Sequence, residues 1–303
     1  MKFEVSILGS NSAIPAFGRN PTSQVINYNE HLFLIDCGEG TQMRFKPAGI
    51  KYSRIEHIFI SHLHGDHIFG LIGLLTTYNL LGRKKALHIY AHQPLQESIH
   101  HQLKIGGTTL NYLLQFHSIK SGSTSILFES DTLKVSTFPV SHKIDCNGFL
   151  FEEAPKLRKF KADKGVAYNI PVDKIPAIKK GEDFVLANGT LIANDLISDP
   201  PEPVRKYAYV TDTEYLESII PFISGVDLLY HEATFDKSFE KRAAATKHST
   251  ALQAGSIALK AGVKKLIIGH FSAKYKSLDL LLTEAQEVFS NTELAIEGQI
   301  FKV

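Results

Sequence analysis

His62-Leu63-His64-Gly65-Asp66-His67 is a six-residue stretch with four side chains that can bind a metal ion. It follows the apolar run Ile58-Phe59-Ile60 and precedes a helical pattern from Leu71 to Leu81. A strand that ends in such a loop places its polar side chains at the carboxyl edge of a sheet, where open α/β sheets keep their sites. Imidazole nitrogen and carboxylate oxygen are both zinc ligands. The stretch therefore predicts an α/β fold with a metal site at the end of a strand.

The composition of this stretch favours two open metal ions over one closed structural site. Structural zinc sites usually close with four ligands and often use cysteine, which the stretch lacks. Two ions about 3.5–4 Å apart can together activate water and hold a phosphoryl centre. The alternative is a group of hydrogen-bonded histidines without metal. We expect that simpler role for seven other histidines, namely His31, His57, His88, His92, His100, His101 and His117.

Three distant residues, His142, Asp212 and His270, each follow a predicted strand and could complete a dinuclear site. Asp212 has two carboxylate oxygens and could bridge the ions, and coordination can bring the pKa of bound water near 7. Asp36 either orients one of the ligands or caps a turn. The expected ligands are His62, His64 and His142 for one ion, Asp66, His67 and His270 for the other, and Asp212 for both.

The composition is that of an ordinary globular chain. It has 303 residues, of which 44% are hydrophobic and 21% are charged. No apolar run approaches the roughly 18 residues of a membrane span, and the first residues resemble a strand more than a signal segment. Cys37 and Cys146 are too few for a disulfide framework. We therefore expect a cytoplasmic protein without a membrane segment.

Short apolar runs alternate with helical patterns along the chain, as βαβ units require. Strands are expected at 5–8, 25–27, 32–35, 54–60, 87–90, 126–128, 133–138, 207–210, 228–230, 265–268 and 294–301. Helices are expected at 71–81, 214–223, 251–261 and 278–289. The pattern stops near Phe151 and returns near Tyr207. We interpret residues 1–303 as one domain that carries an inserted arm at 151–200.

The arm contains a basic stretch from Lys156 to Lys180, with eight basic residues against two acidic ones, a charge of +6 in 25 residues. Such a stretch could bind the phosphates of a nucleic acid. A solvated loop or linker is the alternative.

Taken together, these residues resemble the metallo-β-lactamase superfamily and, within it, the short-form ribonuclease Z family. The narrower resemblance rests on His231-Glu232-Ala233-Thr234, His248-Ser249-Thr250 and His270-Phe271-Ser272-Ala273-Lys274-Tyr275. It implies an αβ/βα sandwich, in which two mixed sheets pack face to face with helices outside. It also implies a homodimer with two zinc ions per subunit. The implied activity is cleavage of precursor tRNA at its 3′ end, leaving a tRNA 3′-hydroxyl and a 5′-phosphorylated trailer.

The resemblance also implies which residues bind tRNA. The arm at 151–200 falls where the family carries its tRNA-binding arm, and the loop Pro15–Asn20 resembles one that recognises the tRNA 3′ end. Phe17 stands where that loop usually has lysine, and the arm lacks the usual Gly-Pro pair. The implied substrate-binding residues are Arg19, Asn20, Lys274, Lys159, Lys161 and Lys164.

Catalytic roles follow for His248 as the proton donor to the leaving oxygen and for Glu232 as its carboxylate partner. Thr250 and Gln253 fit a capping box, so His248 should lie just before the first residue of a helix. A hydrogen bond without chemical function is the alternative for the pair. Asp66 could also accept a proton while it binds metal, and the sequence does not divide the two roles.

Two other functions and the role of one apolar face stay open at this level. A small-molecule phosphodiesterase or other hydrolase of the superfamily would use the same ions, and a metal-stabilised RNA-binding module is a third possibility. The apolar face formed by Leu71, Leu74, Leu75, Tyr78 and Leu81 could serve as a dimer interface or be buried in the subunit's own core.

Overall fold

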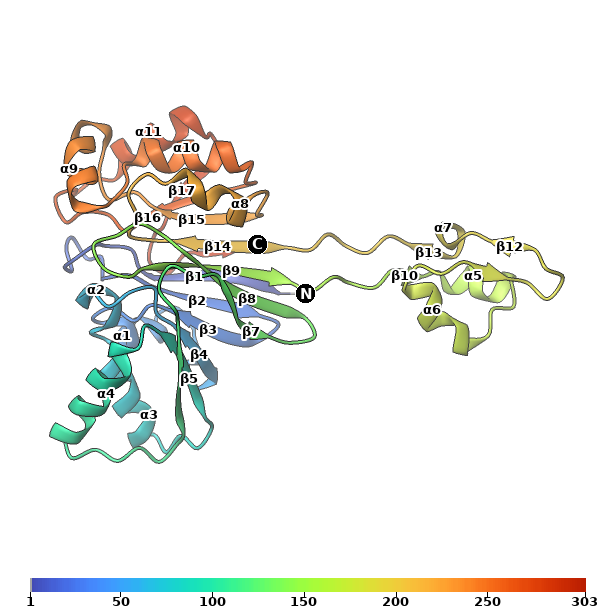
Figure 1. Cartoon of the computed structure of the whole chain (residues 1–303), viewed down its shortest axis with the longest axis horizontal. Helices are drawn as coiled ribbons and strands as arrows, with labels where there is room; N and C mark the ends of the chain where they lie inside the picture. The colour runs from blue at the N-terminus through green and yellow to red at the C-terminus, as the bar shows by residue number, and fades with distance from the viewer. Residues whose placement is uncertain (1) are drawn as a thin grey trace. The chain divides into compact units, whose positions relative to one another are not determined.

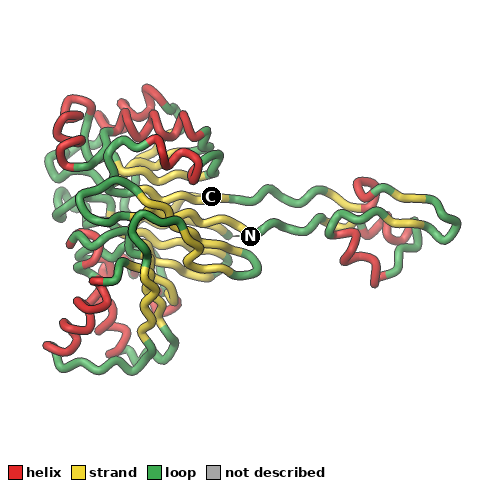
Figure 2. The backbone as a smooth tube through the Cα atoms, in the orientation of Figure 1, coloured by secondary structure: helices red, strands yellow, loops and turns green. Residues whose placement is uncertain are grey.

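The computed structural model describes residues 2–303, which form two compact units. The core unit comprises the residues up to Phe128 together with Val135–Phe151 and Lys206–Val303. The inserted unit comprises Glu129–Lys134 and Glu152–Arg205. Figure 1 gives the order of the elements along the chain, and Figure 2 separates helices, strands and loops.

Two seven-stranded sheets carry the core unit. The first has, in spatial order, β18 (Ile300–Lys302), β1 (Phe3–Gly9), β2 (Ser23–Tyr28), β3 (His31–Ile35), β4 (Ile55–Phe59), β5 (Leu87–Ala91) and β6 (Leu114–Ser118). The second has β17 (Thr292–Leu294), β16 (Leu266–Gly269), β15 (Leu228–Glu232), β14 (Lys206–Val210), β9 (Asn147–Glu153), β8 (Leu133–Pro139) and β7 (Ser125–Glu129). The first is antiparallel from β1 to β3 and parallel from β3 to β6, so the predicted mixed sheet is confirmed.

Helices cover the outer face of each sheet (Figure 1). Those beside the first sheet are α1 (Thr41–Phe45), α2 (Gly65–Ile68), α3 (Leu71–Leu80) and α4 (Pro94–Ile105), with the 3₁₀ turn η1 (Tyr52–Arg54). Those beside the second are α8 (Ile220–Ile223), α9 (Glu240–Thr246), α10 (Ala251–Ala261) and α11 (Asp279–Val288), with η3 (Glu217–Ile219) and η4 (Lys237–Phe239). The predicted α/β sandwich with outer helices is therefore confirmed.

Aromatic side chains fill the space between the two sheets. The ring of Phe33 on β3 lies 5.9 Å from that of Phe151 on β9, and Phe59 on β4 lies 5.6 Å from Phe149. All four side chains are buried. Successive residues of a strand face opposite sides of the sheet, so Ile58, the neighbour of Phe59, packs in the cluster with the helices. Aromatic pairs of this kind contribute about 0.5–1.5 kcal/mol each beyond the area that they bury.

The helix α10 begins and ends where its sequence predicts. The Thr250 hydroxyl accepts a hydrogen bond from the Gln253 amide at 3.2 Å, and the Gln253 side chain accepts one from the Thr250 amide at 2.9 Å. This confirms the capping box. Gly262, in the left-handed conformation, ends the helix.

Two expected elements are wrong. The helix expected at 214–223 is reduced to η3 and α8, because Glu214 bonds to the loop at Ser141 and Pro221 lacks the N–H that a continuous helix would need. The strand expected at 294–301 is two short strands in different sheets. Gly298, with a φ of 86°, lies where the chain crosses from one sheet to the other.

The inserted unit has a small core of its own, formed by Ile178, Ile192 and Ile197. Its elements are β10 (Lys159–Phe160), α5 (Ala162–Ala167), η2 (Val172–Lys174), α6 (Ile175–Lys179), β11 (Phe184–Val185), β12 (Leu191–Ile192), α7 (Asn194–Ile197) and β13 (Ser198–Asp199). At its base, the Glu153 amide donates to the Arg205 carbonyl at 3.0 Å, and their side chains form an ion pair at 2.7 Å.

Acidic residues offset the basic stretch within this unit. From Glu152 to Arg205 the chain has nine basic and nine acidic side chains. Arg158 pairs with Asp195, and Lys161 pairs with Asp199 at 3.2 Å. The segment from Glu152 to Arg205 therefore has no net charge.

The apolar face of α3 is buried within the subunit. Leu71, Leu74, Leu75 and Tyr78 have at most 1% of their surface exposed, whereas Leu81, just after the helix, is 64% exposed. Burial in the subunit's own core thus accounts for this face. Among the described residues, none of the helices combines the length and the hydrophobicity of a membrane span.

A ladder of half-buried histidines on the first sheet predicts acid-dependent stability. His57 stacks on His88 at 4.9 Å, and burial, with the nearby His88, lowers the pKa of His57 to about 4 despite the opposing charge of Glu56. In the unfolded chain the ordinary pKa is near 6.5, so the unfolded state takes up the proton first as the pH falls. We expect the free energy of unfolding to fall between pH 6.5 and pH 4.

Urea denaturation of His57→Phe at pH 7 and pH 5 tests this expectation. The variant should lose less stability on acidification than the wild type, because the phenyl ring stacks without binding a proton. The exposed His101→Gln variant should behave as the wild type does. Equal losses in His57→Phe and the wild type would contradict the prediction.

Candidate active site

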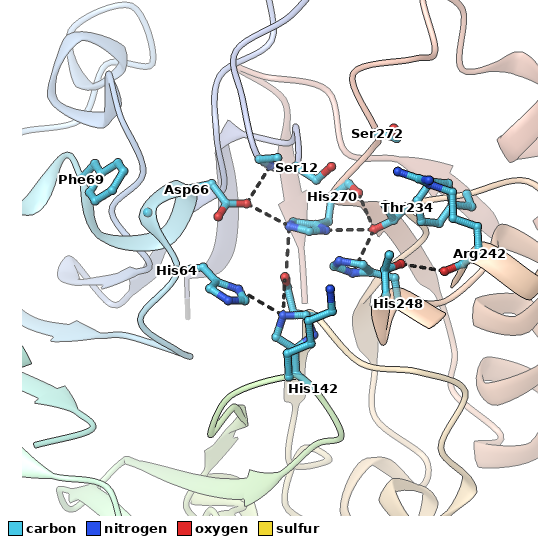
Figure 3. A pocket seen from close by; sticks show the side chains of 16 residues that line it. Ser12, His64, Asp66, Phe69, His142, Thr234, Arg242, His248, His270 and Ser272 are labelled. Carbon is cyan, nitrogen blue, oxygen red and sulfur yellow. Dashed lines mark hydrogen bonds and ion pairs between the residues drawn. The ribbon is translucent and has the colours of Figure 1, made fainter. Parts of the chain in front are cut away.

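Loops at the ends of four strands bring the candidate metal ligands together in the core unit (Figure 3). The stretch His62–His67 follows β4 and begins α2, and His142 follows β8. Asp212 follows β14 and His270 follows β16. All seven residues expected to bind metal therefore converge, although they come from both sheets.

The first cluster surrounds the Nδ1 atom of His64. That atom lies 3.0 Å from Nε2 of His62 and 3.1 Å from Nε2 of His142. The Oδ2 atom of Asp212 completes the cluster, 3.5 Å from the His62 nitrogen and 3.7 Å from the His142 nitrogen. Three nitrogens and one carboxylate oxygen thus face a common point.

The second cluster uses the other oxygen of Asp212. Its Oδ1 atom lies 3.3 Å from Nε2 of His67 and 3.2 Å from Nε2 of His270. The Oδ2 atom of Asp66 lies 3.5 Å and 3.4 Å from the same two nitrogens. Each carboxylate oxygen of Asp212 therefore faces one cluster, the arrangement expected of a bridging ligand.

The donor atoms of these clusters suit a metal ion. The Nε2 atoms of His67 and His270 are buried and have no hydrogen-bond partner among the described residues. A buried polar atom without a partner costs stability unless something binds it. Imidazole nitrogens and carboxylate oxygens are both common ligands of divalent metal ions. The ligand role of each residue stays a prediction.

Hydrogen bonds to the outer ring nitrogens hold three of these imidazoles in place. The Nδ1–H of His142 donates to the Lys247 carbonyl at 2.9 Å, and that of His67 donates to the buried Asp36 carboxylate at 2.8 Å. The Nδ1 atom of His270 lies 2.9 Å from the Thr234 hydroxyl. When Nδ1 carries the proton, Nε2 presents its lone pair to the site.

Asp36 has the contacts of an orienting residue. Besides His67, its carboxylate accepts hydrogen bonds from the Ser61 amide and hydroxyl, both at 2.8 Å, and from the Tyr209 hydroxyl at 2.7 Å. Of the two roles expected for Asp36, these contacts favour orientation of a ligand. Asp36, Asp212 and His270 all have positive φ values, of 54°, 44° and 58°. Such strain in non-glycine residues concentrates at functional sites.

His248 and Glu232 form a hydrogen-bonded ion pair beside the two clusters. The Nδ1 atom of His248 lies 2.9 Å from Oε1 of the fully buried Glu232. Burial alone would lower the pKa of His248, but the charge and hydrogen bond of Glu232 outweigh it and raise the pKa to about 9. His248 also has a ring nitrogen within 4.8 Å of donor atoms of Asp212 and His270. A protonated imidazole is therefore available next to the clusters.

Neighbouring residues keep the carboxylates of Glu232 and Asp66 ionised. Burial would raise the pKa of Glu232, but the neighbouring His248 lowers it, and the Thr213 amide donates to Glu232 at 2.7 Å. Burial is likewise outweighed at Asp66, where His67 and His270 lower the pKa. An ionised Asp66 with so low a pKa suits metal binding better than a role as proton acceptor.

The clusters open into a pocket of about 520 Å³. Phe69, Lys143 and Arg242 are among the lining residues that sequence reasoning missed. Phe69 and Lys143 each lie within three residues of an expected ligand, and that proximity could have indicated them. No pattern in the sequence distinguishes Arg242, which the folding of α9 brings to the pocket.

The expected substrate-binding residues of the N-terminal loop bond to the chain itself. Arg19 donates to the Asn11 side chain at 2.9 Å and to the Tyr275 carbonyl at 2.5 Å. The Asn20 side chain donates to Glu297 at 2.8 Å. Neither residue lines the pocket. These contacts fix the loop, and a role of the two side chains in binding RNA stays a prediction.

The expected basic contacts differ in their surroundings. The Lys274 ammonium lies over the ring of Phe239, 2.9 Å from its centroid. In the inserted unit, Lys159 and Lys164 are exposed, and no ion pair links either to another described residue, whereas Lys161 is paired. Contact of these lysines with RNA stays a prediction.

A sandwich of two mixed sheets with paired histidine and aspartate clusters at its strand ends defines a hydrolase of the metallo-β-lactamase fold. Residues 3–164 match the family model described as anti-Pycsar protein Apyc1. The ribonuclease Z of Bacteroides fragilis is 48% identical over 297 residues, which are 98% of each chain. That of Porphyromonas gingivalis is 43% identical over 295 residues, 97% of each chain.

Solved structures agree on the fold. The short form of human tRNase Z has a TM-score of 0.72 at 24% identity and covers 99% of each chain. The metallo-β-lactamase fold protein YhfI of Bacillus subtilis has a TM-score of 0.70 at 20% identity. The chain belongs to the ribonuclease Z family, and its residues 3–164 belong to the family described as anti-Pycsar protein Apyc1.

Proposed function

We propose that this protein is an endoribonuclease that cleaves precursor tRNA at its 3′ end with two zinc ions per subunit. The cleavage leaves a tRNA 3′-hydroxyl and a 5′-phosphorylated trailer. Family membership at 48% identity over 98% of each chain supports the activity. The observation that carries the mechanism is the His248–Glu232 pair next to two clusters of metal-type donors.

The residues that would hold the ions are those of the two clusters. When bound, two zinc ions supply a water with a pKa near 7 and neutralise the charge that develops on the phosphate. Asp212 would serve both ions, because each of its oxygens faces one cluster. Asp36 would hold His67 in the orientation that binds metal.

His248 would then protonate the 3′-oxygen of the tRNA as that oxygen leaves. Its pKa of about 9 means that the ring carries a proton at neutral pH. Glu232 stabilises that protonated form, and the Thr213 and Thr234 hydrogen bonds hold Glu232 in place. Proton donation by a positioned group typically contributes about 10²–10⁴-fold to the rate.

A cytoplasmic location and a homodimer are further parts of this proposal. Processing of tRNA places the enzyme where precursor tRNA is made. Because α3 buries its apolar face in the subunit, a dimer would have to use other exposed side chains, of which Met43, Leu80 and Leu81 are candidates.

Cleavage of labelled precursor tRNA tests the activity. Zinc-loaded protein should make a single cut at the 3′ end of the acceptor stem, with a 3′-hydroxyl on the tRNA and a 5′-phosphate on the trailer. Hydrolysis of small phosphodiesters alone would favour the small-molecule hydrolase. Binding of the precursor without any cut would favour the RNA-binding module.

Removal of the inserted unit should weaken tRNA binding. Replacing residues 155–203 with a short glycine-serine link keeps Glu153 and Arg205, whose backbones already bond to each other at 3.0 Å. The dissociation constant of precursor tRNA should rise and depend less on salt, because lysine–phosphate contacts release counterions. Cleavage of bis(p-nitrophenyl) phosphate should continue.

Point variants refine the same test. The double variant Lys159→Ala/Lys164→Ala should lower the slope of log Kd against log salt by about one for each phosphate that these lysines neutralise. Lys84→Ala, an exposed lysine of the core unit, is the matched control and should leave the slope unchanged. If the slope of log Kd against log salt is unchanged in both the deletion and the double variant, the unit is a solvated insertion that does not bind tRNA.

A further inference from the structure

Phe69 is an exposed aromatic side chain at the rim of the pocket. It directly follows α2, and 70% of its surface is exposed. Figure 3 shows it on the other side of Asp66 from His248 and Arg242. Isolated exposed apolar residues are common on protein surfaces, so exposure alone assigns no role. The surroundings of the ring are more specific.

Gly65 allows the ring to lie directly on the backbone between two expected ligands. A Cβ atom at position 65 would lie 2.1 Å from Cε2 of Phe69 and 2.4 Å from its Cζ. Any side chain at 65 would therefore displace the ring. Gly65 itself stands between His64 and Asp66, so the backbone that supports the ring also carries one donor of each cluster. The ring is held next to the reacting centre while most of its surface stays in water.

We propose that Phe69 stacks against the base of the first trailer nucleotide, the one on the 3′ side of the cut. This inference rests on the proposed function. His248 faces the leaving 3′-oxygen, so the last nucleotide of the tRNA lies on its side of the pocket. The nucleotide joined through the 5′-oxygen of the same phosphate then extends toward the opposite side, where Phe69 lies. Stacking on an aromatic ring accepts every base, because each has a π-face.

The test compares a normal precursor tRNA with one whose first trailer nucleotide lacks its base. For the wild type, kcat/KM should fall by about tenfold to a hundredfold on the abasic substrate, the usual effect of one stacked base. Phe69→Leu should lose about as much on the normal precursor and should show little further loss on the abasic one. Phe69→Tyr keeps a ring and should retain most of the base dependence.

The matched control is Ile105→Ala, because Ile105 is 74% exposed and lies outside the pocket lining. This variant should respond to the abasic substrate as the wild type does. A wild type that cuts both precursors equally well would overturn the proposal, and so would additive losses in Phe69→Leu. A third precursor lacks the base of the last tRNA nucleotide instead. A loss of kcat/KM on that precursor alone would also overturn the proposal. A wild type that cuts no precursor at all would instead refute the proposed function.

Discussion

Replacing His248 with alanine is expected to lower turnover by about 10²–10⁴-fold while zinc content stays unchanged. The reason is that His248 carries the proton that the leaving oxygen needs, whereas its Nδ1 atom is occupied by Glu232 and neither of the two ligand clusters requires it. Single-turnover cleavage of precursor tRNA and metal analysis of the same sample measure the two quantities. Normal turnover would remove His248 from the mechanism, and loss of zinc would make it a ligand.

Glu232→Gln provides a second readout for the same pair. The amide keeps the shape of the side chain but removes the charge that raises the pKa of His248. Burial then opposes protonation with only the charges of Asp212 and Asp66 against it, so the pKa of His248 should fall. The variant should therefore lose more activity at pH 8 than at pH 6. His101→Ala, an exposed histidine, is the control and should leave the pH profile unchanged.

Replacing Asp212 with alanine should have a still larger effect, because it removes a donor from both clusters at once. Turnover should fall beyond about 10⁴-fold, the upper range for loss of an acid–base group alone. Zinc content should fall with it. The measurement is metal stoichiometry after dialysis, together with single-turnover cleavage. Two tightly bound zinc ions in this variant would contradict the proposed ligand set.

Asp212→Asn is an instructive companion to that variant. Asparagine keeps one side-chain oxygen and replaces the other with an NH₂ group, which cannot bind a metal ion. Because each oxygen of Asp212 faces a different cluster, the amide should retain one zinc ion more strongly than the other. Asp145→Asn, a control on the surface, should retain two.

The metal-type donors were predictable because they occupy one kind of position, the residue or loop directly after a strand. That rule located His142, Asp212 and His270 without knowledge of the fold. It could not reveal that Asp212 divides its two oxygens between the clusters, since this depends on how the folded chain places all seven residues. Phe69, two residues after His67, could have been found from that proximity. Arg242 could not, because a pocket rim is a property of the folded surface and no sequence pattern marks this residue.

Regular elements were predictable where periodicity and end signals agreed. The capping box at Thr250 marks the start of α10, and Gly262 marks its end. Residues 294–301 have a continuous apolar pattern but belong to two sheets, because tertiary packing at Gly298 overrides local preference. The surroundings of the basic stretch likewise depend on folding. Two of its acidic partners, Asp195 and Asp199, lie outside the stretch, and folding pairs them with Arg158 and Lys161.

The bonds between Glu153 and Arg205 have a consequence for how such enzymes diversify. The chain leaves the sandwich at β9 and re-enters at the adjacent strand β14, so an insertion of any length begins and ends at one place. Evolution, or a protein engineer, can therefore exchange the inserted unit at this joint while the two-sheet framework is inherited whole.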